Sequence, residues 1–135
     1  MTESEPLRPR PRPCPSCPYR RDCPSGLWHP DEYRKLPGYD GDTAYQHPGV
    51  FCCHSAPDCL CAGWVGHRDP AELLALRIGT AAGTVSGDVW DYRTDVPLFA
   101  SGWQAARHGL ADIEHPGPEA RAAIVKIVRA RPDIT

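Results

Sequence analysis

The sequence predicts a small, irregular, α-rich domain, α+β at most, that a metal site built on cysteines holds together. All seven cysteines lie in two short clusters, residues 14–23 and 52–61. Leu, Ile, Val, Phe and Met number only 24 of 135 residues, and a domain with so little core often needs a covalent or metal staple. The clearest periodic segments have helical spacing, and no long strand pattern is present.

Composition and charge argue against several classes of protein. No apolar stretch approaches the roughly 18 residues of a membrane helix, and residues 1–6 lack the apolar segment of a secretion signal. We therefore expect a cytoplasmic protein with no membrane contact, where clustered cysteines are more often metal ligands or redox groups than disulfides. The net charge of −2 argues against a dedicated nucleic-acid binder, because such domains are usually strongly basic.

The chain is expected to divide into a tail and one domain. Residues 1–13 form a flexible Arg/Pro tail, and residues 14–135 form a single metal-stabilised domain. Within it, residues 14–67 supply the metal knuckle and loops, and residues 68–131 the helical part. Arginine alternates with proline in the tail, which favours an extended segment and blocks a helix. The tail is either a solvated lead-in to the cysteines or an arm that grips phosphate.

The first half of the domain is expected to consist mainly of turns and loops. Prolines interrupt the first cysteine cluster, so no helix runs through it. Pro30 opens a short helix with acidic residues in its first turn, and Pro37-Gly38 ends it. Residues 38–49 are expected as loop, and residues 50–52 as a very short strand.

The second half begins with a well-marked helix. Asp69 as N-cap, Pro70 at the first position and Glu72 three residues after the cap predict a helix over residues 70–78. The glycine that follows is expected to end it. Residues 79–93 are expected to be loop.

Two further helices are predicted near the C-terminus. Ser101 and Gln104 have the spacing of a capping box, which predicts a helix over residues 102–108 with Gly109 at its end. Residues 118–131 are the most periodic part of the chain. Their apolar stripe consists of Ala120, Ala123, Ile124, Ile127 and Val128.

The pair Cys14 and Cys17 is the strongest sign of a metal site. The two-residue spacer lets a tight turn aim both sulfurs at one ion. A structural zinc ion takes four nitrogen or sulfur ligands, and an iron–sulfur cluster also takes four thiolates. The sequence therefore leaves zinc and a 4Fe–4S cluster as alternatives.

The second pair of ligands must come from the other cysteine cluster. Neighbouring side chains of an extended chain point to opposite faces, so at most one of Cys52 and Cys53 is expected to bind the ion. Cys59 and Cys61 are the other candidates in this cluster. The residues held in reserve are Cys23, His54 and His67.

Three other cysteine chemistries fit the sequence poorly. Residues 13–17 match the Pro-Cys-x-x-Cys of zinc deaminases, but no His-x-Glu precedes them. A thioredoxin-like motif would follow a strand and open a helix, whereas proline surrounds this one. No spacing singles out a Cys–His pair as nucleophile and base.

Several side chains beside the cysteines have more than one predicted role. Arg20 and Arg21, followed by Asp22, predict a salt bridge that orients the loop, donors to the metal thiolates, or a phosphate site. Trp28 and Trp64 are either lids over the metal loop or platforms on which bases stack. Any protein or nucleic-acid partner would bind through the Arg/Pro arm and Arg20-Arg21.

The cysteine-containing strings resemble a family of unknown function, small proteins of actinobacteria and their phages. The strings are Cys14-x-x-Cys17-Pro18-Tyr19-Arg20-Arg21-Asp22, Phe51-x-Cys53-His54 and Cys61-Ala62-Gly63-Trp64. The resemblance covers roughly residues 13–78. It implies a core of four cysteines, Cys14, Cys17, Cys53 and Cys61, and leaves Cys23, Cys52 and Cys59 as extras. The expected fold is therefore a small α-rich domain stapled by a four-cysteine metal site.

The resemblance implies no activity, so the expected function depends on the metal. We expect a zinc-stabilised small binding or regulatory protein of unknown partner. The alternative is an iron–sulfur redox or sensor protein. A metal-dependent enzyme is less favoured, because no residue stands out as its acid or base.

Overall fold

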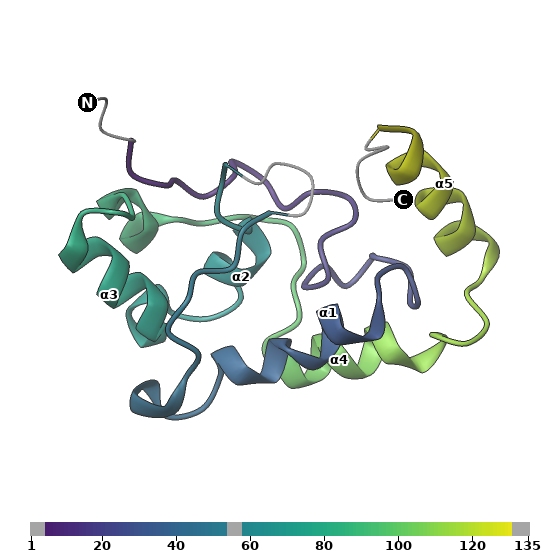
Figure 1. Ribbon diagram of the computed structural model, residues 1–135, viewed down its shortest axis with the longest axis horizontal. Helices are drawn as coiled ribbons and strands as arrows, with labels where there is room; N and C mark the ends of the chain where they lie inside the picture. The colour runs from purple at the N-terminus through teal and green to yellow at the C-terminus, as the bar shows by residue number, and fades with distance from the viewer. Residues whose placement is uncertain (1–4, 54–57, 131–135) are drawn as a thin grey trace.

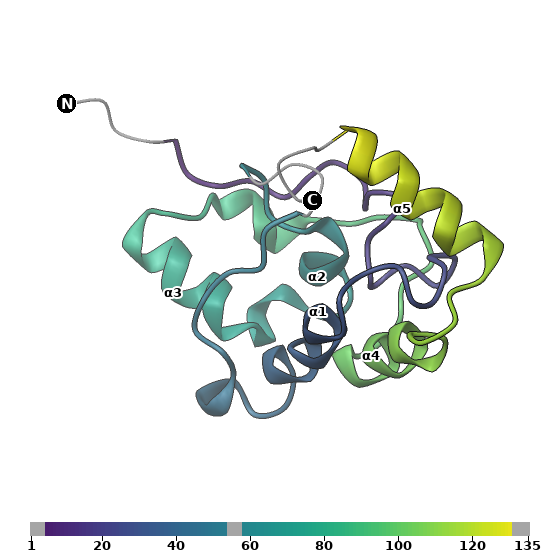
Figure 2. The ribbon, with the colours of Figure 1, turned by 45° about the vertical axis from the view of Figure 1, so that its right-hand side comes forward.

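The computed structural model describes residues 5–53 and 58–130, which form short helices joined by long loops (Figures 1 and 2). The five α-helices are α1 (Pro30–Arg34), α2 (Ala62–Gly66), α3 (Leu74–Ala82), α4 (Gly102–Ala111) and α5 (Pro118–Ala130). Four 3-10 turns accompany them, η1 (Leu36–Tyr39), η2 (Thr43–Tyr45), η3 (Pro70–Glu72) and η4 (Gly87–Asp91). Extended chain in the described residues pairs only through isolated bridges, so the small α-rich class is confirmed and no sheet forms.

The N-terminal Arg/Pro segment runs along the domain, as the purple strap of Figure 1 shows. The Leu7 amide donates to the Thr84 carbonyl at 2.9 Å, and the Arg10 amide to the Leu60 carbonyl at 3.1 Å. The Leu60 amide returns a hydrogen bond to the Arg8 carbonyl at 2.9 Å. The described part of the predicted tail is therefore hydrogen-bonded to two other segments from Leu7 onward.

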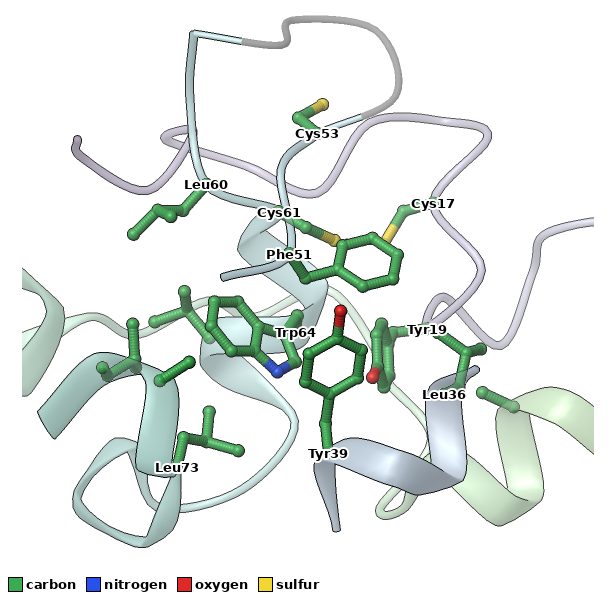
Figure 3. Close-up of a cluster of buried hydrophobic side chains, with 14 of the residues drawn as sticks. Cys17, Tyr19, Leu36, Tyr39, Phe51, Cys53, Leu60, Cys61, Trp64 and Leu73 are labelled. Atoms are coloured by element: carbon green, nitrogen blue, oxygen red, sulfur yellow. The ribbon is translucent and has the colours of Figure 1, made fainter. Parts of the chain in front are cut away.

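An aromatic cluster around α2 forms the centre of the core (Figure 3). Trp64 is fully buried, and its ring meets that of Tyr39 edge-on at 5.5 Å between centroids. Phe51 meets Tyr39 at 5.6 Å and Tyr19 at 6.0 Å, also edge-on. The sequence analysis did not predict α2, because a five-residue helix buried on every side shows no amphipathic pattern.

Helix α4 begins as predicted and packs against α1 and η1. The Ser101 hydroxyl accepts a hydrogen bond from the Gln104 amide at 3.1 Å, which caps the helix. The predicted end was wrong, since the helix continues through Gly109 to Ala111. A Cβ on Gly109 would lie 2.1 Å from the Tyr33 ring, so this glycine makes room for α1 instead of stopping the helix.

The helix predicted over residues 70–78 is divided and shifted. Asp69 caps the short turn η3 by accepting from the Ala71 amide at 3.0 Å, and α3 then begins at Leu74. Gly79 lies inside α3, where a Cβ would come within 2.4 Å of Val85. Gly83 ends the helix with a φ of 79°, a conformation that glycine adopts without strain.

The remaining expectations are met in part. The short strand over residues 50–52 is reduced to a single antiparallel bridge between Cys52 and Leu60, and η4 interrupts the loop expected over residues 79–93. Helix α5 follows its prediction, and its apolar stripe is less exposed than its other faces, although residue 131 lies outside the described residues. None of the described helices has the length and apolar character needed to cross a membrane.

Replacing Gly109 by alanine tests the close packing of α4 on α1. The added methyl group collides with the Tyr33 ring, so we expect Gly109→Ala to lower the free energy of unfolding by about 1–3 kcal/mol despite alanine's better helix propensity. Gly117→Ala is the control, because a Cβ there meets nothing within 4 Å. Urea denaturation measures both variants, and equal stability of the two would contradict the packing argument.

Candidate metal centre

Four cysteines from two distant parts of the chain are buried near one another. Cys14, Cys17, Cys53 and Cys61 are each less than 5% exposed, with values of 3%, 1%, 4% and 3%. They are the four that the resemblance implies. The structure therefore buries every predicted site residue, and it brings two of them, Cys17 and Cys61, into contact.

The first pair lies in a tight turn. The Cys17 amide donates to the Cys14 carbonyl at 2.9 Å, and the Arg20 amide donates to the Cys17 carbonyl at 3.0 Å. Two successive turns thus fold this segment back on itself. Trp28 covers the first turn, since its indole Nε1 donates to the Ser16 carbonyl at 2.7 Å, and this supports the reading of Trp28 as a lid.

Backbone pairing decides which residues of the second cluster share a face. The Cys53 amide donates to the Cys59 carbonyl at 2.9 Å, and the Cys61 amide donates to the Phe51 carbonyl at 2.8 Å. These bonds flank the bridge between Cys52 and Leu60. Side chains alternate along each segment, so Cys53 and Cys61 share one face and Cys52 lies on the other.

The sulfur atoms form two pairs. Cys17 Sγ lies 3.6 Å from Cys61 Sγ, and Figure 3 shows these two sulfurs close together. Cys14 and Cys53 also lie near each other, since Cys53 is the largest cause of the raised pKa of Cys14, while the Cys14 sulfur lies 3.5 Å from Ser16 Oγ. In the described residues, no group of three or more Cys, His, Asp or Glu side chains was detected that could hold a metal ion.

Contact between the thiols shifts their acidity. The hydrogen bond with Cys53, together with burial, raises the pKa of Cys14. Burial and the hydrogen bond to Cys17 raise the pKa of Cys61. The hydrogen bond from Cys61 lowers the pKa of Cys17, against the effect of burial.

Several N–H groups point at these sulfurs. Cys17 Sγ accepts hydrogen bonds from the backbone amides of Tyr19 and Gly63, and Cys61 Sγ accepts one from the Trp64 amide. A Cβ on Gly63 would lie 2.4 Å from Cys17 Sγ, so only glycine allows this approach. Such donors favour negative charge on sulfur. The resemblance included Gly63, but the sequence analysis gave it no role.

Arg10 adds a positive charge beside the second pair. Its Nη1 donates to Cys53 Sγ at 3.7 Å, and this contact is the largest cause of the raised pKa of Arg10. The other arginines of the N-terminal segment face carboxylates: Arg8 contacts Asp88, and Arg12 Nη1 lies 3.6 Å from Asp95 Oδ1. The Arg/Pro arm is therefore already paired with the domain in this structure.

Cys59 and the described reserve ligands are placed less favourably. Cys23 Sγ faces the carbonyl of Pro24 at 3.8 Å, and burial raises the pKa of Cys23 to about 12. Cys59 is partly exposed. His54 lies outside the described residues.

His67 is engaged with other partners through both ring nitrogens. Nδ1 lies 2.5 Å from the Trp64 carbonyl, and Nε2 lies 2.9 Å from Asp40 Oδ1. Both ring nitrogens are thus occupied by contacts within the protein, so neither is directed at the cysteine sulfurs. The ring also stacks on Tyr19 at 4.5 Å between centroids.

Asp40 connects α2 to the start of α4. Its Oδ2 accepts from the Gly102 amide at 2.5 Å while Oδ1 faces His67. Burial alone would raise the pKa of Asp40, but the hydrogen bonds from His67 and Gly102 and the nearby Arg68 hold it below its ordinary value. Sequence reasoning missed this residue, because a single Asp in a polar loop carries no signal.

The charged residues after the first cysteine pair have structural partners. Arg20 donates two parallel hydrogen bonds to the Asp22 carboxylate, from Nε to Oδ1 and from Nη2 to Oδ2, each at 2.7 Å. A third nitrogen of Arg20 donates to the Pro13 carbonyl at 3.1 Å. This arrangement supports the salt bridge that orients the loop. Arg21 points elsewhere, with its Nε donating to the Leu98 carbonyl at 2.9 Å.

The chain belongs to the family described as "Family of unknown function (DUF6283)", whose model matches residues 9–131. The matched range contains the four buried cysteines, the Asp40–His67 pair and all five α-helices. No curated protein and no solved structure matches the chain. Any activity must therefore be argued from the arrangement of the site itself.

Removing the charge of Asp40 tests the link between α2 and α4. Its side chain is 7% exposed and that of His67 is 0% exposed, so Asp40→Asn removes a buried charge that contacts His67 and the Gly102 amide. We expect a loss of about 3 kcal/mol in the free energy of unfolding at neutral pH. The control is Asp95→Asn, whose exposed pair with Arg12 contributes about 1 kcal/mol at most.

The pH dependence gives the same test a second measurement. The pKa of Asp40 is lower in the folded state than the ordinary value of 3.8, so its contribution is complete above that pH and is lost as the pH falls below it. Stability measured between neutral and acidic pH should therefore fall less in Asp40→Asn than in the wild type. Parallel curves for the two proteins would contradict this role.

Proposed function

We propose that this protein is a zinc-stabilised binding module in which Cys14, Cys17, Cys53 and Cys61 hold one structural zinc ion. The observation that carries the proposal is the contact between two buried thiols from distant segments, Cys17 and Cys61, and the burial of Cys14 and Cys53 in the same core cluster. Thiolates that bind one zinc ion at about 2.3 Å in a tetrahedron lie about 3.8 Å apart. The 3.6 Å between these sulfurs is close to that separation and far from the roughly 2 Å of a disulfide.

The surroundings of the thiols suit a charged metal–thiolate group. Backbone amides of Tyr19, Gly63 and Trp64 donate to the sulfurs, and Arg10 brings a cation. Hydrogen bonds of this kind orient metal ligands and offset the charge of four thiolates. Side-chain rotation that draws the Cys14–Cys53 pair onto the Cys17–Cys61 pair would complete the ligand set.

A site of this composition favours a structural role over a catalytic one. Four thiolates fill the coordination of zinc and leave no position for water or substrate. The four cysteines join the N-terminal turn to the segment that enters α2, beside the aromatic core. The ion would therefore fix the scaffold, while other surfaces carry the binding.

An iron–sulfur protein is the second candidate, and the pairing of the thiols bears on its type. A two-iron cluster takes two cysteines on each iron, which agrees with two thiol pairs. In a four-iron cluster each cysteine binds a different iron, which holds the sulfurs farther apart than the 3.6 Å between Cys17 and Cys61. A two-iron cluster is therefore the better iron–sulfur alternative, in place of the 4Fe–4S cluster considered from the sequence.

Elemental analysis of the purified protein tests the metal directly. We expect a colourless protein with one zinc per chain, whose melting temperature falls by roughly 10 °C or more when a chelator removes the ion under reducing conditions. Cys17→Ser and Cys61→Ser should lose the zinc. The matched control is Cys52→Ser, since Cys52 lies on the opposite face of its segment and should keep full zinc content.

Two outcomes would reject the zinc proposal. A brown protein that contains iron and absorbs near the visible bands of an iron–sulfur cluster would favour the second candidate. A protein free of metal, whose melting temperature does not respond to chelation, would exclude both candidates.

The affinity for zinc should depend on pH. Because the pKa values of Cys14 and Cys61 are raised, these thiols hold their protons at neutral pH until an ion displaces them. Each proton released makes the affinity rise about tenfold per pH unit, so we expect at least that slope between about pH 6.5 and pH 8. Competition with a chromophoric chelator measures it, and an affinity independent of pH would contradict thiol ligation.

A further inference from the structure

We infer that the outer face of α4 binds single-stranded nucleic acid, which gives the proposed binding module its partner. The inference rests on the proposed function only for the stability of the scaffold. The surface, called the α4 face below, consists of Arg21, Arg34, Phe99, Trp103, Gln104 and Arg107. Figures 1 and 2 show α4 at an edge of the molecule, beside α1.

Two hollows meet on this face at one arginine. The first, of about 430 Å³, lies between Trp103 and Arg34, and the second, of about 440 Å³, lies between Phe99 and Arg21. Arg107 lines both of them. Trp103 and Arg107 are four residues apart on α4 and therefore neighbours on its surface.

One aromatic ring of the α4 face, that of Trp103, is available for stacking. Trp103 is 66% exposed, which is unusual for so large an apolar side chain in a protein with a small core. Phe99 is half-buried, and its ring already packs against the Arg21 guanidinium at 5.4 Å and the His108 ring at 5.2 Å, so it supports the face without offering a free ring. A planar base fits on the exposed Trp103 ring, and a guanidinium on the same face strengthens the attraction.

The charge of this face is positive, although the chain as a whole carries −2. The linings of both hollows contain three arginines and one histidine and no Asp or Glu. In residues 5–53 and 58–130, Arg21 and Arg107 form no ion pair, whereas Arg34 pairs with Asp31 at an exposed site. This differs from the N-terminal arm, where Arg8 and Arg12 already face carboxylates. Cations without carboxylate partners suit phosphate groups.

An exposed aromatic ring beside arginines without carboxylate partners favours single-stranded nucleic acid over the other anionic macromolecules. A duplex stacks its bases inward, so its phosphates would meet the arginines but its bases would not reach Trp103. An acidic peptide would use the cations and has no rings to stack on the aromatic side chains. A single strand uses both, because its bases are free to stack while its backbone follows the arginines.

Fluorescence anisotropy with a labelled oligo(dT) of about 20 nucleotides tests the inference on the full, metal-loaded chain. We expect binding at low salt that Trp103→Ala weakens by roughly fivefold to a hundredfold without changing the salt dependence. Arg107→Gln should weaken binding and lower the slope of log affinity against log salt by about 0.7, the value for one lost phosphate contact on a single strand.

A second Trp–Arg pair provides the matched control. Trp90 on η4 and Arg77 on α3 line a separate hollow of about 440 Å³. We expect Trp90→Ala and Arg77→Gln to bind oligo(dT) like the wild type. Metal content and melting temperature are measured for all four variants, so a lost scaffold and a lost binding surface give different results.

Three outcomes would overturn the inference. The first is no binding of oligo(dT) by the folded, metal-loaded protein at low salt. The second is an equal loss of binding in the Trp90 and Arg77 variants, which would move binding away from α4. The third is a labelled polyglutamate of equal length that binds as tightly as oligo(dT), which would assign the face to acidic protein segments. Metal content is measured separately, so the proposed zinc site can fail or hold independently of these three outcomes.

Discussion

The burial of four cysteine thiols between two distant segments is the constraint on which the rest of this molecule depends. The contact between Cys17 and Cys61 joins the N-terminal turn to the start of α2. Trp64 follows Cys61 by three residues and fills the centre of the aromatic cluster (Figure 3). Whatever fixes the sulfurs therefore also fixes the entry into the core, in a chain with few aliphatic residues to do so.

Buried polar side chains join loops to helix termini through hydrogen bonds. Gln46 is buried, and its Nε2 donates to the carbonyls of Gly41 and Glu72 at 3.0 and 2.9 Å. Its Oε1 accepts from the Leu74 amide at 2.9 Å, at the start of α3. Asp40 does the same at the start of α4. Buried polar groups are stable only when paired, so each of these residues fixes a loop and a helix terminus together.

The charges of the chain fall into two groups with different roles. Carboxylates neighbour Arg8, Arg12 and Arg20, so these cations hold loops in place. The arginines around α4 lack such partners in large part and lie beside aromatic rings. The sequence predicted the Arg/Pro arm as a partner-binding element, because arginines are dense there. Charge density along the chain does not show which of these cations pair with carboxylates once the chain is folded.

The sequence by itself determined the α-rich class, the cap at Ser101 and the apolar stripe of α5, because these depend on residues within a turn or two of one another. Together with the family resemblance, it also indicated the four cysteines. Only the tertiary structure decided that Gly109 lies inside a helix and that Asp40 joins two of them. Those roles arise from side chains that approach from distant segments, and no local pattern records such contacts.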